Sequence, residues 1–280
     1  MLEGIIVPKL GTLSLAAAGR RDIEALHHSL KATPYRANRV LSLLSKMFSL
    51  AMEWKWTTEN PSKGIPRYVE DKRETWLSEE QVQSLLAALD QYPDQNAADA
   101  LRLIVFTGSR EGEVLKAEWT QFDLKRGIWI KPSHHVKQKK VEHMPLNDDA
   151  LKILKHMHAA KSGTFLFPGG VKPGAAVKSK ARVTIHRTWV QVCKIAGLAT
   201  AFEIQGKRRK LTRWKPALRI HDLRHTFASH LVSRGESLHI VGKLLGHTRA
   251  ETTMRYSHVA DEALRKAANR FSEVIAANGN

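Results

Sequence analysis

The chain has 280 residues, and 45 Lys and Arg against 27 Asp and Glu give it a net charge of +18 at pH 7. This excess of basic residues favours a polyanionic partner, above all nucleic acid, because grouped cations release counterions from phosphates. No apolar stretch approaches the ~18 residues of a membrane span, and the single cysteine excludes internal disulfides and cysteine-rich zinc sites, so we expect a cytoplasmic protein.

The first part of the chain predicts a small helical domain over residues 1–62. One helix is expected over 22–30, and a longer one begins at Thr33-Pro34, with proline at the first helical position, and runs toward Trp56. Apolar residues in the longer helix follow the spacing of a buried face: Val40, Leu44, Met47, Ala51 and Trp54. Its cations form either a solvated face or, given the overall charge, a DNA-facing surface: Arg36, Arg39 and Lys46.

Residues 63–75 carry many charges and almost no apolar periodicity, which is typical of a linker. A capping-box pattern from Ser78 to Gln81 opens a second domain, which we place at 76–280. A buried helix is predicted over 98–106, and another begins at Arg110.

Between Gln121 and Leu146 the apolar period changes. Segments 122–124, 128–130 and 141–146 predict a small three-stranded antiparallel sheet. The rest is mostly helical, apart from loops and a basic segment from Gly206 to Lys215. The expected fold class is therefore mainly α with a small antiparallel β-sheet, in two domains.

Near the C-terminus, three short motifs bring together histidines, arginines and one tyrosine. They are His221 to His225, then Leu245-Gly246-His247, then Arg255-Tyr256. A tyrosine hydroxyl among cations suits chemistry on a phosphodiester, which needs a nucleophile for phosphorus and positive charge for the equatorial oxygens. The alternative for a single tyrosine or histidine is a packing role with satisfied hydrogen bonds.

A zinc site is a further alternative, because His221 and His225 are four residues apart on one helix. Asp222 follows the first histidine where zinc proteases have glutamate, and the charge of Arg224 would repel a metal. We therefore expect no metal.

These residues, in this order after a basic helical domain, resemble the tyrosine recombinases of the phage integrase family. Thr107 to Glu113 is similar to the first arginine box of that family, and His221 to Thr226 to its H-x-x-R box. Leu244 to His247 and Met254 to Tyr256 are similar to its third histidine and nucleophile boxes. The resemblance implies a site-specific DNA recombinase or integrase that cleaves and rejoins strands through a 3′-phosphotyrosine intermediate.

The resemblance also implies a role for each matched residue. Arg110 and Arg224 would clamp the scissile phosphate, because a guanidinium donates to two oxygens at once. Tyr256 would attack phosphorus, with the cations favouring the phenolate and His221 as candidate proton acceptor. His247 would bind the phosphate or support the site. Glu113 would orient the basic residues, or serve only as a favourable acid in the first turn of its helix.

The leaving 5′-oxygen needs a proton, which the family takes from a lysine between the second and third strands. Lys137 matches that lysine best, but Lys139 and Lys140 are neighbours and remain alternatives. Residues 142–144 also depart from the usual pattern before Pro145.

The resemblance further implies double-stranded DNA as partner, a homotetramer on paired sites, and possible accessory proteins that bend DNA or set direction. ATP is not expected, because the phosphotyrosine conserves the energy of the broken bond. No metal or other cofactor is expected, because the sequence shows neither a phosphate-binding glycine loop nor a carboxylate cluster for a metal pair. The location would be the bacterial cytoplasm or nucleoid. A helix over 261–276 would pack onto a neighbouring protomer or onto its own domain, and the arm-binding domain common in phage integrases is expected to be absent or removed. Further backbone contacts are predicted for a basic cluster: Lys207, Arg208, Arg209, Lys210 and Arg213.

Two other classes of protein remain open at this point. A type IB topoisomerase uses similar chemistry without assembling two sites. A non-catalytic DNA-binding protein of the same fold would bind DNA without forming a covalent complex.

Overall fold

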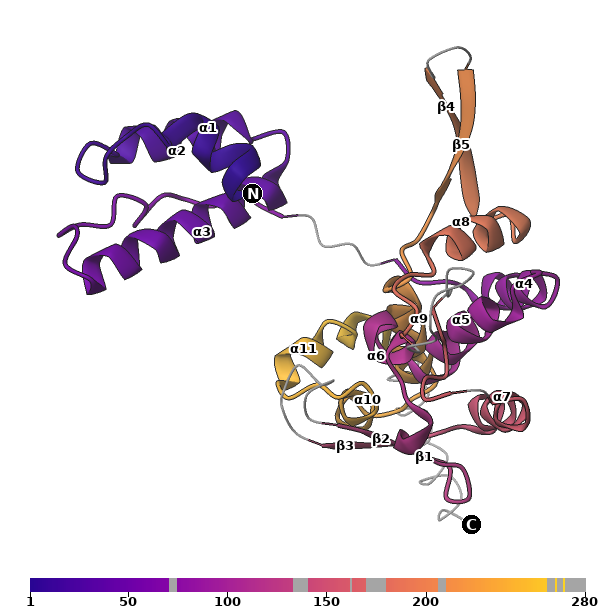
Figure 1. The fold of residues 1–280 in the computed structure, drawn as a ribbon. Helices are drawn as coiled ribbons and strands as arrows, with labels where there is room; N and C mark the ends of the chain where they lie inside the picture. Colours follow the sequence, from indigo (N-terminus) through magenta and orange to yellow (C-terminus); the bar gives the residue numbers. More distant parts are fainter. Residues whose placement is uncertain are drawn as a thin grey trace. The chain divides into compact units, whose positions relative to one another are not determined.

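The computed structural model describes residues 1–70, 75–132, 141–161, 163–169, 180–205 and 210–260, together with Arg265 and Asn269. The chain divides into two compact units, Met1–Glu74 and Thr75–Asn280 (Figure 1). Each unit has a hydrophobic core of its own. The assignment of the units as DNA-binding and catalytic domains stays a prediction at this stage.

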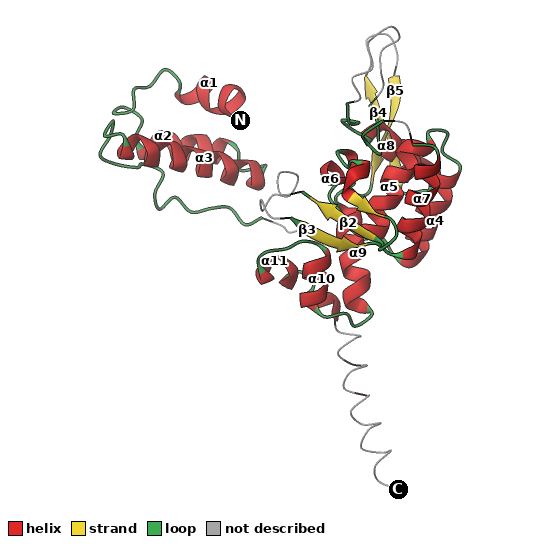
Figure 2. Ribbon diagram, turned by 60° about the horizontal axis from the view of Figure 1, so that its bottom comes forward, coloured by secondary structure: helices red, strands yellow, loops and turns green. Residues whose placement is uncertain are grey.

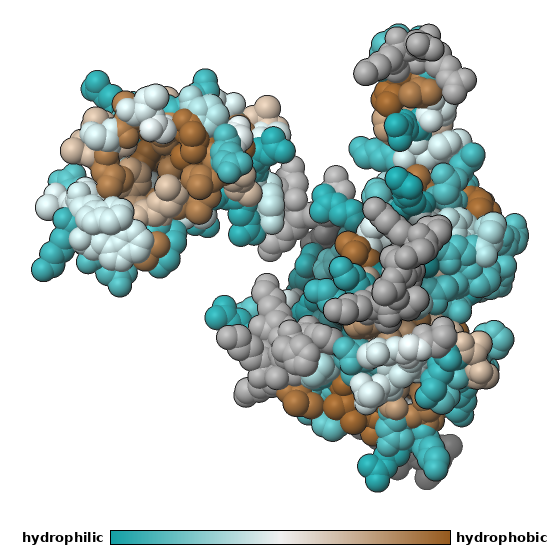
Figure 3. Space-filling view, viewed as in Figure 1, coloured by the Kyte–Doolittle hydropathy of each residue, from teal (hydrophilic) through white to brown (hydrophobic). Residues whose placement is uncertain are grey.

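The first unit is helical. A short π-helical turn, η1 (Leu2–Ile6), leads into α1 (Val7–Leu10), and α2 (Arg20–Ser29) lies against α3 (Pro34–Glu53). The two helices expected from the sequence are thus confirmed. Apolar residues gather on one face of this unit (Figure 3).

The buried stripe of α3 differs in part from the predicted one. Met47 and Trp54 are 40% and 54% exposed, whereas Leu41 and Phe48 are buried. The core face consists of residues that a 3.6-residue period places together: Val40, Leu41, Leu44, Phe48 and Ala51. Spacing alone did not separate this face from its neighbour, because apolar residues occur on both.

Residues that follow α3 pack back onto the first unit. Ile65 joins its core, and the Tyr68 ring stacks on His27 with ring centroids 4.4 Å apart. The side-chain amide of Asn38 donates to the Tyr68 carbonyl at 2.8 Å and accepts from its N–H at 3.0 Å. Residues 65–68 of the predicted linker therefore lie against these helices.

The second unit is also mainly helical. Ser78 caps its first helix as predicted: its hydroxyl accepts from the Gln81 N–H at 3.3 Å, and the Gln81 side chain accepts from the Ser78 N–H at 3.0 Å. The helices of this unit are α4 (Glu79–Asp90), α5 (Gln95–Thr107), α6 (Glu111–Leu115), α7 (Asp148–Ala159), α8 (His186–Ile195), α9 (Asp222–Ser233), α10 (Leu238–Leu244) and α11 (Ala250–Met254), with the 3-10 turns η2 (Trp119–Gln121) and η3 (Ser257–Ala260).

The predicted three-stranded sheet is confirmed. β1 (Phe122–Asp123), β2 (Ile128–Lys131) and β3 (Glu142–Pro145) pair antiparallel in the order β1-β2-β3. Trp129 lies opposite Met144, and both side chains are buried in the core of the unit. Figure 2 shows β2 and β3 beside α10 and α11.

A second antiparallel pair was not predicted. β4 (Ala199–Gln205) and β5 (Lys210–Pro216) form a hairpin that projects from the second unit (Figure 1). Most of its residues are exposed on both faces, including Phe202 at 45%. The alternation of apolar and polar residues in β4 is short, from Phe202 to Gln205, and β5 shows little apolar periodicity, so the sequence did not predict this pair.

The segment after α9 folds as a helical hairpin. α10 and α11 pack together, and Tyr256 follows α11. Arg249 precedes α11 and makes no side-chain capping bond. Among the described residues no helix is long and apolar enough to span a membrane. The predicted fold class, mainly α with small antiparallel sheets, is confirmed.

Candidate active site

A tight reversal between α5 and α6 places Arg110. Gly108 ends α5 with φ +62°, and its N–H donates to the Ile104 carbonyl at 2.9 Å. A Cβ at Gly108 would lie 2.6 Å from Cδ1 of Phe227, so both the backbone and the packing require glycine. Two residues later Arg110 stands immediately before α6, with its side chain 31% exposed.

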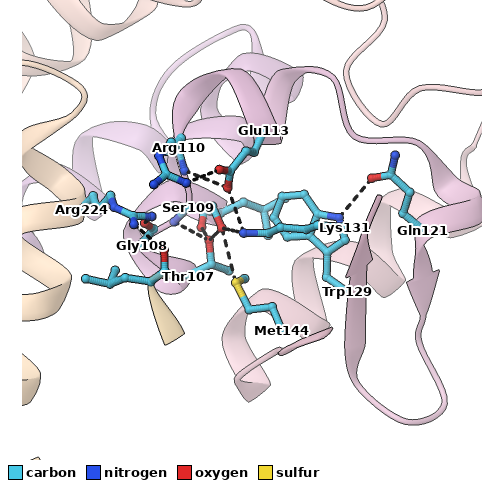
Figure 4. A network of polar contacts seen from close by, with 12 residues as sticks. Thr107, Gly108, Ser109, Arg110, Glu113, Gln121, Trp129, Lys131, Met144 and Arg224 are labelled. Atoms are coloured by element: carbon cyan, nitrogen blue, oxygen red, sulfur yellow. Dashed lines mark hydrogen bonds and ion pairs between the residues drawn. The ribbon is translucent and has the colours of Figure 1, made fainter. Parts of the chain in front are cut away.

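Glu113 links Arg110 to a second cation that the sequence did not single out. One carboxylate oxygen accepts from Arg110 Nη1 at 2.6 Å, and the other accepts from Lys131 Nζ at 2.9 Å (Figure 4). Burial alone would raise the pKa of Glu113, but the charges of Lys131 and Arg110 outweigh burial and lower it. Glu113 is therefore a carboxylate shared by two cations, in agreement with the orienting role that the resemblance implies.

Lys131 lies on β2 and is enclosed on three sides. Its ammonium donates to Glu113 and, at 3.2 Å, to Ser109 Oγ, and it lies 4.5 Å from the Trp129 ring centroid. Gln121 Oε1 fixes the Trp129 ring by accepting from Nε1 at 3.1 Å. Burial lowers the pKa of Lys131, and the Glu113 carboxylate opposes that shift.

Arg224 connects three parts of the site from within α9. It is 3% exposed, and its guanidinium donates to the Gly108 carbonyl at 2.9 Å and to the Leu245 carbonyl. Gly108 belongs to the first arginine box, and Leu245 precedes Gly246 and His247. Burial, assisted by the nearby Arg110 charge, lowers the pKa of Arg224 to about 10, so it stays a cation at neutral pH.

Tyr256 meets α9 through the residue that follows Arg224. Its hydroxyl lies 2.7 Å from Nδ1 of His225, whose ring packs edge-on against His221 with centroids 5.2 Å apart. The tyrosine is 3% exposed and packs with Val241 and Leu245. The hydrogen-bond partner of Tyr256 is thus His225, not His221, the proton acceptor that the resemblance implies.

Burial and the charges around Tyr256 shift its pKa in opposite directions. Burial raises the pKa of the phenol, and the cations of Arg255 and Arg224 oppose this rise. The net direction is upward, whereas the sequence suggested that the cations would dominate and favour the phenolate. In this resting geometry the tyrosine is therefore neutral and needs a proton acceptor in order to react.

The histidines of the site are neutral at physiological pH. Burial and the Arg255 charge lower the pKa of His225 to about 4. Burial and the charges of Arg224 and Arg110 do the same for His247, also to about 4. His247 Nδ1 lies 2.9 Å from Thr253 Oγ1, which fixes its ring. Burial and the Arg224 charge also lower the pKa of His221.

The six described residues of the predicted catalytic set lie in one region of the second unit, where they interact by the bonds above or through their charges: Arg110, Glu113, His221, Arg224, His247 and Tyr256. Lys137 lies outside the described residues, as do its neighbours Lys139 and Lys140, so the choice among these lysines stays a prediction.

The predicted DNA-contact residues are in part described. Arg36, Arg39 and Lys46 are exposed on α3, within a sector of about 80° if each residue turns by 100°. Lys210 and Arg213 are exposed on β5, and Lys210 pairs with Glu203 at 3.2 Å. Lys207, Arg208 and Arg209 lie outside the described residues, and so does almost all of the predicted helix over 261–276.

Sequence reasoning missed Lys131 and the role of His225. Lys131 stands two residues after Trp129 on a predicted strand, so the two side chains share one face. A lysine on the apolar face of a strand is unusual, and this was the available signal. His225 is one residue from Arg224 and four from His221, and only the tertiary contact with Tyr256 distinguishes it.

Comparisons with known proteins agree with this geometry. The family model described as "Phage integrase family" matches residues 75–263. The integrase of Escherichia phage P2 is 30% identical over 249 residues, which cover 87% of this chain and 61% of that protein. This chain therefore spans less than two thirds of that relative.

Two solved structures share the fold. The Tn1549 transposon integrase in complex with transposon right end DNA gives a TM-score of 0.68 at 16% identity, over 89% of this chain and 83% of that one. A lambda integrase tetramer bound to a Holliday junction gives 0.65 at 19% identity, over 92% of this chain and 68% of that one.

Proposed function

The chain belongs to the phage integrase family, and from this we propose that it is a tyrosine recombinase that cleaves and rejoins DNA strands at specific sites. The observation that carries the proposal is the position of Arg224. This one buried guanidinium bonds the turn before Arg110 and the turn before His247, while the adjacent His225 bonds Tyr256. Four motifs separated in sequence are therefore brought together around Arg224 and His225.

In the proposed reaction the Tyr256 oxygen attacks the scissile phosphorus. A bond forms between that oxygen and phosphorus, the bond from phosphorus to the 5′-oxygen breaks, and a 3′-phosphotyrosine and a free 5′-hydroxyl result. His225 Nδ1 accepts the phenolic proton, because it is already within hydrogen-bond reach of the Tyr256 hydroxyl. His221, which packs against His225, is the alternative acceptor.

Positive charge near the phosphate stabilises the transition state. Arg110 presents a partly exposed guanidinium, and the bonds described above use two of the five N–H donors of Arg224. His247 supplies a neutral imidazole beside them. Lys137, by resemblance, protonates the leaving 5′-oxygen.

Rejoining reverses these steps. The 5′-hydroxyl of another strand attacks the phosphotyrosine and releases Tyr256, so no bond energy is lost and no ATP is required. In this proposal no metal is required either, because Arg110 and Arg224 supply the positive charge. We propose that two DNA sites are paired in a homotetramer, the state in which the similar lambda integrase was solved on a Holliday junction. Accessory proteins that bend the DNA or set the direction would complete the assembly.

Both units would contribute to DNA binding. The exposed cations of α3 are the proposed contacts of a DNA-binding first unit, and the second unit is the proposed catalytic domain. The basic residues of the β4–β5 hairpin would add sequence-independent affinity, because each phosphate contact releases counterions. The reaction would take place in the bacterial cytoplasm or nucleoid.

The direct test is covalent adduct formation. Wild type and Tyr256→Phe are incubated in EDTA with supercoiled plasmid and with plasmid that carries the candidate attachment sites, then denatured with detergent. We expect a detergent-resistant adduct with wild type alone. An adduct with the phenylalanine variant would show that Tyr256 is not the nucleophile, and loss of the wild-type adduct in EDTA would show that a metal is required.

A further inference from the structure

Lys131 is a buried cation that the proposed reaction does not use. It lies on β2, 3% exposed, and therefore cannot touch a DNA phosphate in this geometry. Its partners nevertheless belong to the site, because Glu113 also bonds Arg110 and Ser109 immediately precedes Arg110. Lys131 thus contacts the residues that surround Arg110 without reaching the surface itself.

Arg110, Glu113 and Lys131 form a row of ion pairs in which only Arg110 is substantially exposed to solvent. The exposed fraction of the side chain is 31% for Arg110, 6% for Glu113 and 3% for Lys131. Figure 4 shows Glu113 between the two cations, with Lys131 on the side away from Arg224. Only Arg110 has a substantial surface for a phosphate oxygen.

The charge of Lys131 matters for the charge of the group formed by Arg110, Glu113 and Lys131. Glu113 orients Arg110 through a 2.6 Å bond, but a carboxylate this close would also cancel the positive charge of the guanidinium. With Lys131 at 2.9 Å on the other carboxylate oxygen, the three groups together carry one positive charge. The Glu142 carboxylate and the Arg224 guanidinium also influence Lys131, with opposite signs.

We propose that Lys131 is a positioning residue: its ammonium offsets the charge of Glu113, so that Glu113 holds Arg110 in place without neutralising it toward a phosphodiester. The inference rests on the proposed function, because it supplies the cation that a phosphate would meet. Lys131 also ties β2 to this turn through Ser109, whose hydroxyl lies 3.6 Å from Met144 Sδ on β3.

A merely structural Lys131 would give a different outcome from a charge-offsetting one. Lys131→Met removes the cation and leaves Glu113 paired with Arg110 alone, whereas Lys131→Met with Glu113→Gln removes both charges and restores the total. Replacement of both members of a buried pair is often neutral for folding, while removal of one member is costly. Lys152→Met is the matched control, because it removes one cation from a solvent-exposed pair with Asp149 at 3.7 Å.

Two readouts keep the inference separate from the proposed function. One is the affinity for inorganic phosphate, and the other is the rate of covalent adduct formation on plasmid DNA, with thermal melting as a check on folding. We expect Lys131→Met to weaken both by about 10- to 100-fold, the range found when partners of metal ligands are removed. The double variant should recover most of that loss, and Lys152→Met should match wild type.

Each result decides a specific point. A double variant no better than Lys131→Met, or a folded Lys131→Met with wild-type phosphate affinity, overturns the inference about Lys131. If wild type forms no adduct on any DNA tested, the proposed function fails, yet the order of phosphate affinities still tests the charge argument. Recovery in phosphate binding together with recovery in adduct rate supports both.

Discussion

The hydroxyl of Tyr256 lies 2.7 Å from Nδ1 of His225, so the proposed nucleophile and a neutral imidazole are already paired in the resting site. Burial and the Arg255 charge hold the pKa of that imidazole at about 4, so it is neutral and one of its two ring nitrogens can accept a hydrogen bond. Tyr256 is hydrogen-bonded to the residue next to Arg224, so a single helix, α9, positions both the proposed nucleophile and the arginine proposed to bind the phosphate.

Two substitutions at His225 separate proton transfer from positioning. His225→Ala removes the contact, while His225→Asn keeps an acceptor near Nδ1 that cannot take up a proton. We expect both to slow adduct formation by about 10²-fold, the lower end for general base catalysis. If His225→Asn reacts at the wild-type rate, the histidine has a positioning role. If His221→Asn slows adduct formation more than His225→Asn does, His221 is the proton acceptor.

Arg224→Lys tests whether the planar guanidinium holds the turn at Gly108 and the turn after Leu245 together. Lysine keeps the charge but cannot donate to the carbonyls of Gly108 and Leu245 in the same planar geometry. One buried carbonyl then lacks its partner, which costs about 1–3 kcal/mol of unfolding free energy. Thermal melting should fall by several degrees, and adduct formation should fall with it. A melting temperature equal to that of wild type would mean that the guanidinium does not hold these turns together.

Gly108→Ala and Gly112→Ala are expected to change the free energy of unfolding in opposite directions. At Gly108 the positive φ and the 2.6 Å approach to Phe227 predict a loss of about 2–4 kcal/mol. At Gly112, within α6, a Cβ meets nothing within 4 Å, so alanine should stabilise by about 0.5–1 kcal/mol. Chemical denaturation of both variants measures the difference, and equal effects would contradict this description of the turn.

The two histidines of low pKa make stability depend on pH. His225 and His247 have a pKa of about 4 when folded, against an ordinary value of 6.5, so the unfolded chain binds more protons between these values. Stability should therefore be fully present above pH 6.5 and fall as the pH drops toward 4.

The melting temperature, measured across that pH range, gives the slope of stability against pH. His225→Asn and His247→Asn should each reduce this slope, because asparagine does not titrate. His239→Asn, at an exposed position on α10, is the control and should leave the slope unchanged. A slope that stays the same in all three variants would exclude these histidines as its source.

The sequence by itself determined the elements that have strong local signals. The helices α2, α3, α4 and α5 follow from apolar spacing and caps, because one buried face imposes a period. The sheet β1-β2-β3 follows from the change of period after Gln121. The family motifs also identified Arg110, Arg224, His247 and Tyr256 as one candidate site, because their order along the chain is distinctive.

Tertiary structure alone decided which side chains touch. Lys131 reaches Glu113 from a strand 18 residues away, and His225 reaches Tyr256 across 31 residues. Such contacts depend on how separate elements pack, and no local period encodes that packing. The hairpin β4–β5 was missed for a different reason: most of its residues are exposed, and the alternation of apolar and polar residues covers only Phe202 to Gln205. The charge balance at Arg110 is likewise a property of the folded chain, since it requires a carboxylate and two cations from separate elements to meet, with Glu113 and Lys131 buried.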